Sequence, residues 1–212
     1  MYYGLSSPKI FSNDTNDCNN LICIYKEFRE KFLDKDTRPK LNGIFIYVEN
    51  YELFGINKRF IHSVSIIDKY YYNSYPCIND ISNTMCHNMC NAECDNNINC
   101  TRQMRRAICY YRLSRIHWVT EIIELANRKS DNIKVWSKVF LDKTTGQWNI
   151  NKRFVWYKFG LANYIIIFEE KYRNGKLYCL SFITAYPVFG RRAEEGFLND
   201  YNEYINKKPD LS

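Results

Sequence analysis

Four apolar runs in the second half of the chain constrain the fold more than any other feature. Each is rich in β-branched and aromatic residues, which is typical of β-strands. The Asn174-Gly175 pair between the last two runs is a strong signal for a hairpin turn. An amphipathic pattern over residues 102–127 precedes the runs and a helix pattern over 191–206 follows them. The sequence therefore predicts an α+β domain in which a helix packs on a four-stranded antiparallel sheet. The runs lie at residues 133–139, 153–159, 164–168 and 177–188.

Residues 1–72 predict a small N-terminal α/β region. Apolar residues recur at three- and four-residue spacing from Leu21 to Phe32, which predicts an amphipathic helix that ends near Asp34. Residues 43–48 and 59–71 fit strands.

The composition is that of a globular protein without a membrane span. The chain has 212 residues, of which 46% are hydrophobic and 17% aromatic, and this excludes intrinsic disorder. No stretch approaches the roughly 18–20 apolar residues of a membrane helix. The first residues lack the basic and apolar regions of a secretory signal. We therefore expect the protein in the cytoplasm, or in the host cytoplasm if a phage encodes it.

A cysteine cluster within residues 73–100 predicts a knuckle held by metal. The chain has nine cysteines, an odd number, and no export signal, so a disulfide framework is not expected. Tetrahedral zinc needs four Cys or His ligands, which this cluster can supply, although its spacing lacks CxxC pairs and could also stack three cysteines on one helical face. An iron–sulfur cluster and free or oxidised thiols are the alternatives. The candidate ligands of a structural zinc ion are Cys77, Cys86, Cys90, Cys94, Cys100 and Cys109.

Positive charge is concentrated in two segments. The formal net charge is +7, and residues 152–192 hold eight Lys or Arg against two Glu. Residues 101–116 add five arginines and no acid. Such a field favours a polyanionic partner, although an ordinary basic face gives the same pattern.

Two side chains near the end of the basic segment 101–116 have the chemistry of a phosphate site. Arg115 falls on the apolar stripe of the expected helix, where it must meet a phosphate, a backbone cluster or a core carboxylate such as Glu169. His117 is the only histidine after residue 101, and its ordinary pKa suits acid or base catalysis. On a continuous helix these two residues point about 200° apart, so one site can use both only if the helix is interrupted near Ser114.

Several segments together resemble the phage branch of the barnase–EndoU–colicin–RelE (BECR) superfamily of nuclease-like domains. The resemblance covers residues 101–206 and implies a domain over 101–212 in which a helix packs on a four-stranded antiparallel sheet. It also implies metal-independent ribonuclease activity, although catalytic residues vary between branches and some members are inactive. The segments are Arg112 to Val119, Ile133 to Trp136, Tyr164 to Glu169, and Phe182 to Pro187 with the basic residues that follow.

These observations predict an RNA-binding, ribonuclease-like protein that acts on tRNA or mRNA. Arg112 and Arg115 would hold the phosphate and His117 would act as acid or base. Thr184 and Tyr186 would orient the reacting groups from one face of the last strand, which they share with Phe182 and Leu180 if the strand alternates regularly. The alternative is a non-catalytic binder, such as a phage-encoded inhibitor of a host-defence complex or a nucleic-acid-binding regulator with a host or phage protein partner. The predicted catalytic residues are Arg115, His117, Thr184 and Tyr186, and the predicted nucleic-acid-binding residues are Arg112, Lys158, Arg191 and Arg192.

Overall fold

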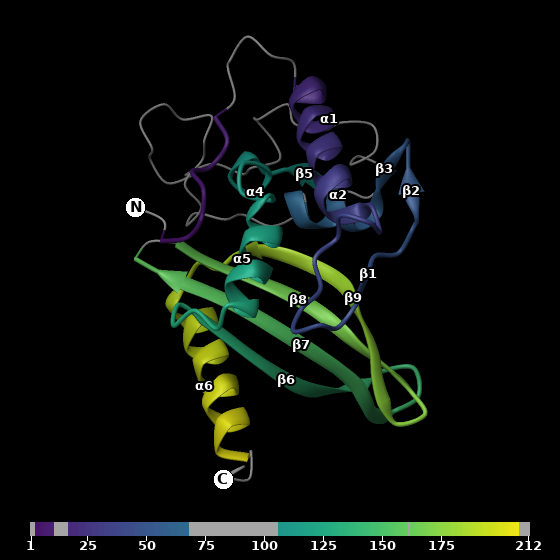
Figure 1. The fold of residues 1–212 in the computed structure, drawn as a ribbon, viewed down its shortest axis with the longest axis vertical. Coiled ribbons are helices and arrows are strands. Elements are labelled where there is room, and N and C mark those ends of the chain that lie inside the picture. Colours follow the sequence, from purple (N-terminus) through teal and green to yellow (C-terminus); the bar gives the residue numbers. More distant parts are fainter. Residues whose placement is uncertain (1–2, 11–16, 68–105, 161, 208–212) are drawn as a thin grey trace. The chain divides into compact units, whose positions relative to one another are not determined.

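The computed structural model describes residues 3–10, 17–67, 106–160 and 162–207 (Figure 1). The chain forms two compact units, which alternate along the sequence and are described separately. Unit 1 contains Met1–Leu5, Pro39–Glu49 and Val119–Ser212, and unit 2 contains Ser6–Arg38 and Asn50–Trp118.

Unit 1 is built on a mixed five-stranded sheet with the strand order β1-β9-β8-β7-β6. The four long strands are antiparallel hairpin neighbours, as the sequence predicts. The prediction of a four-stranded antiparallel sheet is nevertheless wrong. A short fifth strand pairs parallel to β9, with Ile46 opposite Leu180, and the amide of Leu180 donates to the carbonyl of Phe45 at 2.9 Å. The strands are β1 (Ile46–Tyr47), β6 (Ile133–Asp142), β7 (Gln147–Phe159), β8 (Ala162–Arg173) and β9 (Lys176–Pro187).

The turn between β8 and β9 is the one that the sequence predicts. Asn174 and Gly175 have φ values of 52° and 72°. A two-residue hairpin turn with both φ values positive matches the right-handed twist of the strands, and Asn-Gly is the pair that adopts it most readily. The hairpin register is therefore fixed locally, and Arg173 lies directly opposite Lys176.

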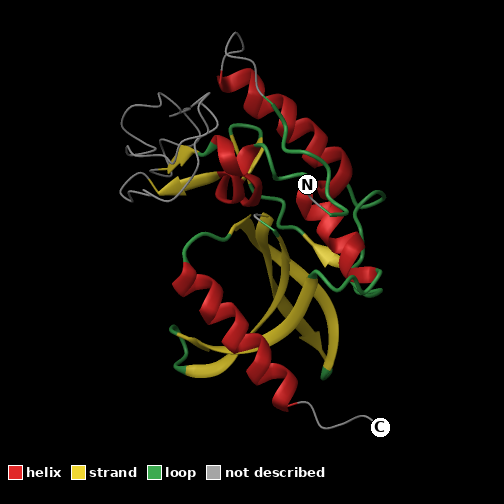
Figure 2. Cartoon of the chain, turned by 90° about the vertical axis from the view of Figure 1, so that its left-hand side faces the viewer, coloured by secondary structure: helices red, strands yellow, loops and turns green. Residues whose placement is uncertain are grey.

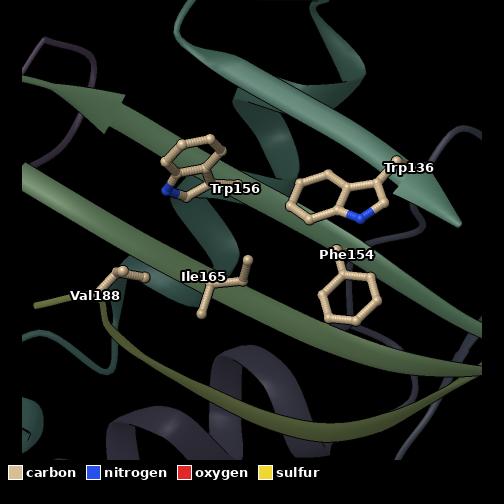
Figure 3. Close-up of a cluster of buried hydrophobic side chains, with 5 residues drawn as sticks. All are labelled: Trp136, Phe154, Trp156, Ile165 and Val188. Atoms are coloured by element: carbon tan, nitrogen blue, oxygen red, sulfur yellow. The ribbon is translucent and has the colours of Figure 1, made fainter. Parts of the chain in front are cut away.

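Helix α6 (Arg191–Lys207) covers one face of the sheet (Figure 2). Beneath it lies a cluster of buried side chains, Trp136, Phe154, Trp156, Ile165 and Val188 (Figure 3). The rings of Trp136 and Phe154 stack with centroids 5.0 Å apart and planes 8° apart. Phe197 of α6 packs against both rings, with its ring centroid 6.0 Å from that of Trp136 and 6.2 Å from that of Phe154. The aromatic composition of β6 and β7 thus explains why α6 packs here.

The opposite face of the sheet is also buried. Val155, Tyr157 and Ile166 alternate with the residues of the α6 face and are fully buried. The hydroxyl of Tyr157 donates to the carbonyl of Tyr3 at 2.9 Å. At Gly4, with φ of +75°, an added Cβ would lie 2.9 Å from Leu125, so the N-terminal residues lie close against helix α5 (Trp118–Asn127).

Unit 2 begins with the predicted amphipathic helix, seen as α1 (Asp17–Phe28) and its π-helical extension η1 (Arg29–Leu33). The strand predicted at residues 59–71 is wrong over residues 59–64, which are helical, whereas residues 65–67 do form a strand. The side chain of Asn57 accepts hydrogen bonds from the amides of Arg59 and Phe60 and so starts a helix. The elements that follow α1 and η1 are β2 (Glu52–Leu53), β3 (Ile56–Asn57), α2 (Lys58–Val64), β4 (Ser65–Ile67), β5 (Arg106–Ile108) and α4 (Tyr110–Leu113).

The single helix predicted over residues 102–127 is also wrong. β5 pairs antiparallel with β4, with Ile108 opposite Ser65, so this part of the segment is extended. The short helix α4 follows, and residues 114–117 form turns before α5 begins at Trp118. The apolar stripe is therefore divided among three elements. No described helix is long and apolar enough to cross a membrane.

Candidate nucleic-acid interface

The predicted catalytic and nucleic-acid-binding residues are divided between the two units. Unit 2 holds Arg112, Arg115 and His117. The other five catalytic and nucleic-acid-binding candidates belong to unit 1. The unit 1 group consists of Lys158, Thr184, Tyr186, Arg191 and Arg192.

Arg115 is buried, as the sequence predicts, with 8% of its surface exposed. Its guanidinium carbon lies 3.5 Å from the ring centre of Tyr111 and 5.4 Å from that of Trp118. One terminal nitrogen donates to the carbonyl of Tyr111 at 3.1 Å and to the hydroxyl of Ser114 at 2.9 Å. Within the described part of the chain, Nε has no hydrogen-bond partner and no carboxylate pairs with Arg115. Cation–π contacts and local oxygen acceptors therefore stabilise the buried charge.

Arg112 converges with Arg106 on the start of β4. Arg112 donates to the carbonyl of Ser65 at 3.0 Å, and Arg106 donates to the same carbonyl at 2.8 Å and to the Ser65 hydroxyl at 2.7 Å. Burial lowers the pKa of the neighbouring His62 to about 4, and the charges of Arg106 and Arg112 act in the same direction. This part of unit 2 is therefore strongly positive around a neutral histidine.

His117 lies in the turns that separate α4 from α5. The argument that a continuous helix would direct Arg115 and His117 about 200° apart therefore does not apply to this chain. The His117 ring is half-buried and meets the ring of Trp118 edge-on, with centroids 6.3 Å apart.

Thr184 and Tyr186 lie on the face of the sheet that α6 covers. They stand opposite Ile167 and Ile165 in β8, and Tyr186 packs against the cluster under α6. The prediction that they share this face with Phe182 and Leu180 is wrong. The register shifts between Ile167 and Phe168, so Ile183 forms a bulge and Phe182 points to the opposite face, where it contacts Phe168.

Two of the three predicted cations in or next to α6 are paired with acids of that helix. Lys158 of β7 forms an ion pair with Glu194. Arg191 pairs with Glu195, one turn further along, at 2.8 Å. Arg192 is exposed. These ion pairs reduce the positive potential that the sequence suggests here.

The predicted zinc ligands fall mostly outside the described residues. Cys77, Cys86, Cys90, Cys94 and Cys100 belong to that part of the chain, so the knuckle over 73–100 stays a prediction. Cys109 is buried just before α4, and its amide donates to the carbonyl of Val64 at 2.9 Å. Among the residues that the structure describes, no three His, Cys, Asp or Glu side chains are grouped to hold a metal ion.

A buried carboxylate network that the sequence analysis missed lies on the sheet face opposite α6. The Glu170 side chain is only 3% exposed and accepts from both Nε and Nη2 of Arg153 at 2.8 Å. Ser137 donates to the same oxygen at 2.6 Å, and the hydroxyl of Tyr172 donates to the other oxygen at 2.7 Å. The hydrogen bond to Glu170 raises the pKa of Tyr172 to about 12, and burial adds to the shift. Glutamate inside an apolar strand was the available sequence signal.

The second feature that sequence analysis missed is the β8–β9 tip, defined here as residues 171–178. These eight residues contain three Lys or Arg, two Tyr and no acid. Five of them line a hollow of about 380 Å³. Lys171 pairs with Glu169 at 2.5 Å, whereas Arg173 and Lys176 are exposed and form no ion pair among the described residues. The hollow is lined by Arg173, Asn174, Lys176, Leu177 and Tyr178.

Comparison with known proteins does not assign the chain to a family. No protein-family model, curated protein or solved structure matches the chain. The structure defines an α+β protein with a mixed five-stranded sheet.

Proposed function

We propose that the protein binds RNA and that the β8–β9 tip contacts the phosphate backbone. The observation that carries the proposal is the placement of Arg173 directly opposite Lys176 at the edge of a hollow. Like charges at directly opposed strand positions repel each other. A phosphate between them would remove this repulsion, and an arginine fork suits phosphate oxygens.

The distribution of acids supports the tip over the predicted cations of unit 1. Lys158 and Arg191 each pair with a glutamate of α6, so binding RNA there would require these ion pairs to break. At the tip, only Lys171 is paired. Phosphate binding at Arg173 and Lys176 therefore does not compete with an acid among the described residues.

The test compares an Arg173→Gln/Lys176→Gln variant with a control of equal charge. The control, Arg128→Gln/Lys207→Gln, removes two exposed cations whose partners are Glu124 and Glu203. Affinity for a labelled RNA is measured by fluorescence anisotropy at several salt concentrations. If both tip cations contact phosphates of a single strand, the slope of log K against log salt falls in magnitude by about 1.4 in the tip variant. An equal effect of both variants would contradict the proposed site, and no binding by the wild type would refute RNA binding.

Metal-independent RNA cleavage is a second candidate function, which the interruption of the helix at residues 114–117 favours. Arg112 and Arg115 of unit 2 would hold the scissile phosphate and His117 of the same unit would transfer the proton. The test is incubation of labelled RNA with the protein in EDTA. Products that persist in EDTA and disappear in a folded Arg115→Ala variant would support cleavage. If the RNA stays intact but its gel band is shifted, the protein binds RNA without cleaving it, which is the function proposed first.

The non-catalytic alternative with a host or phage protein partner makes a different prediction. In that case the protein would neither shift nor cut RNA, and the tip variant would behave like its control. The same anisotropy and cleavage assays therefore separate a protein-binding role from both RNA functions.

A further inference from the structure

The β8–β9 tip also carries exposed aromatic side chains, and these bear on which form of RNA it would bind. Tyr172 is 51% exposed and Tyr178 is 62% exposed, one on each strand of the hairpin. Tyr178 lines the hollow together with Arg173 and Lys176. Solvent-exposed tyrosines next to unpaired cations are the combination with which proteins bind single-stranded nucleic acids, because bases stack on the rings while cations contact the backbone.

A hydrogen bond to a buried carboxylate holds the Tyr172 side chain in place. Its hydroxyl donates to Glu170 at 2.7 Å, and Glu170 is fixed by Arg153 and Ser137. The phenol end is therefore anchored on the sheet while half of the residue stays exposed. An anchored ring loses less conformational entropy when a base stacks on it.

Duplex RNA cannot use such a surface in the same way. The faces of paired bases are already stacked on their neighbours, and proteins contact A-form duplexes through phosphates and 2′-hydroxyls. Cations at the tip would attract both forms, whereas exposed tyrosines add affinity only for unpaired bases. From this combination we infer that the tip is a single-strand site, in which an unpaired base stacks on Tyr178 while Arg173 and Lys176 hold the adjoining phosphate. The inference rests on the proposed function, because it specifies the RNA that the same site binds.

The experiment uses the full-length protein and two probes of equal length, labelled U12 and a 12-base-pair RNA duplex. We expect the wild type to bind U12 more tightly than the duplex at the same salt concentration. Tyr178→Leu should weaken U12 binding at least about fivefold and leave duplex binding unchanged. Tyr178→Phe should retain U12 binding, because it keeps the ring. The aromatic control is Trp148→Leu, which removes a 70% exposed ring from the β6–β7 hairpin and should leave U12 binding unchanged.

The outcomes distinguish this inference from the proposal on which it depends. If Tyr178→Leu binds U12 as the wild type does, or if the duplex binds as tightly as U12, the single-strand site is refuted. Loss of affinity for both probes in Arg173→Gln/Lys176→Gln would then still support RNA binding by charge. If Trp148→Leu weakens U12 binding as much as Tyr178→Leu, stacking is not specific to the tip and the inference fails. If the wild type binds neither probe, the proposed function and the inference are refuted together.

Discussion

Replacing Arg153 by methionine tests how strongly the Glu170 network stabilises unit 1. The substitution removes the two nitrogens that contact Glu170 at 2.8 Å and leaves a carboxylate whose side chain is 3% exposed. Breaking a buried ion pair from one side costs about 3–5 kcal/mol, because an uncompensated charge remains. The hydrogen bonds from Ser137 and Tyr172 remain. We therefore expect the free energy of unfolding to fall by about 3 kcal/mol, the lower end of that range.

The double variant Arg153→Met/Glu170→Met provides the comparison. Replacing both partners by apolar side chains of similar size is often neutral, so the double variant should be more stable than Arg153→Met alone. Urea unfolding followed by tryptophan fluorescence measures each free energy of unfolding, since Trp136 and Trp156 are buried in the adjacent strands. Arg173→Met serves as the control for an exposed arginine and should change stability by at most about 0.5 kcal/mol. The reasoning is refuted if Arg153→Met loses less than about 1 kcal/mol, or if the double variant is the least stable of the set.

Three further predictions follow from other residues. Because the pKa of His62 falls from 6.5 to about 4 on folding, the unfolded chain binds the proton first. Up to about 3 kcal/mol of unfolding free energy should therefore be lost as the pH falls from 6.5 to 4, and His62→Gln should abolish this part of the pH dependence in urea titrations. Gly4→Ala should lower the unfolding free energy by more than Gly43→Ala, since φ is similar at both sites but only Gly4 has Leu125 within 2.9 Å of the added Cβ. Elemental analysis of reduced protein should find one zinc per chain if four of the cysteines bind it, and a value near zero would discard the knuckle.

The parts of the fold that could be predicted depend on local signals. The strands β6 to β9 are long apolar runs, and Asn174-Gly175 fixes one hairpin without help from the rest of the chain. β1 has two residues, and its pairing with β9 joins positions 134 apart in sequence, such as Ile46 and Leu180. The hydrophobic pattern of the sequence gives no information on such a long-range strand pairing. The composition of residues 59–64 favours a strand, but the Asn57 side chain caps a helix at Lys58–Val64.

The candidate site shows the same division between local and non-local information. The burial of Arg115 could be predicted, because an apolar stripe is a local pattern. The pairing of Lys158 with Glu194 could not be predicted, since it depends on where α6 crosses the sheet. The charge of residues 171–178 is visible in the sequence, whereas the register that places Arg173 opposite Lys176 depends on the turn. Charge counting therefore located the basic half of the chain, whereas which of its cations pair with acids depends on the fold.

The parallel pairing of β1 with β9 has a consequence for biosynthesis. β1 is translated before residue 50, yet its partner strand is complete only at Pro187. While the ribosome adds the intervening residues, β1 has no partner strand, and once β9 has been synthesised its outer edge can pair with other chains until β1 binds it. A fragment that starts at residue 101 would retain the four antiparallel strands but lack β1, so the outer edge of β9 would stay unpaired. Such fragments should self-associate more readily than the whole chain.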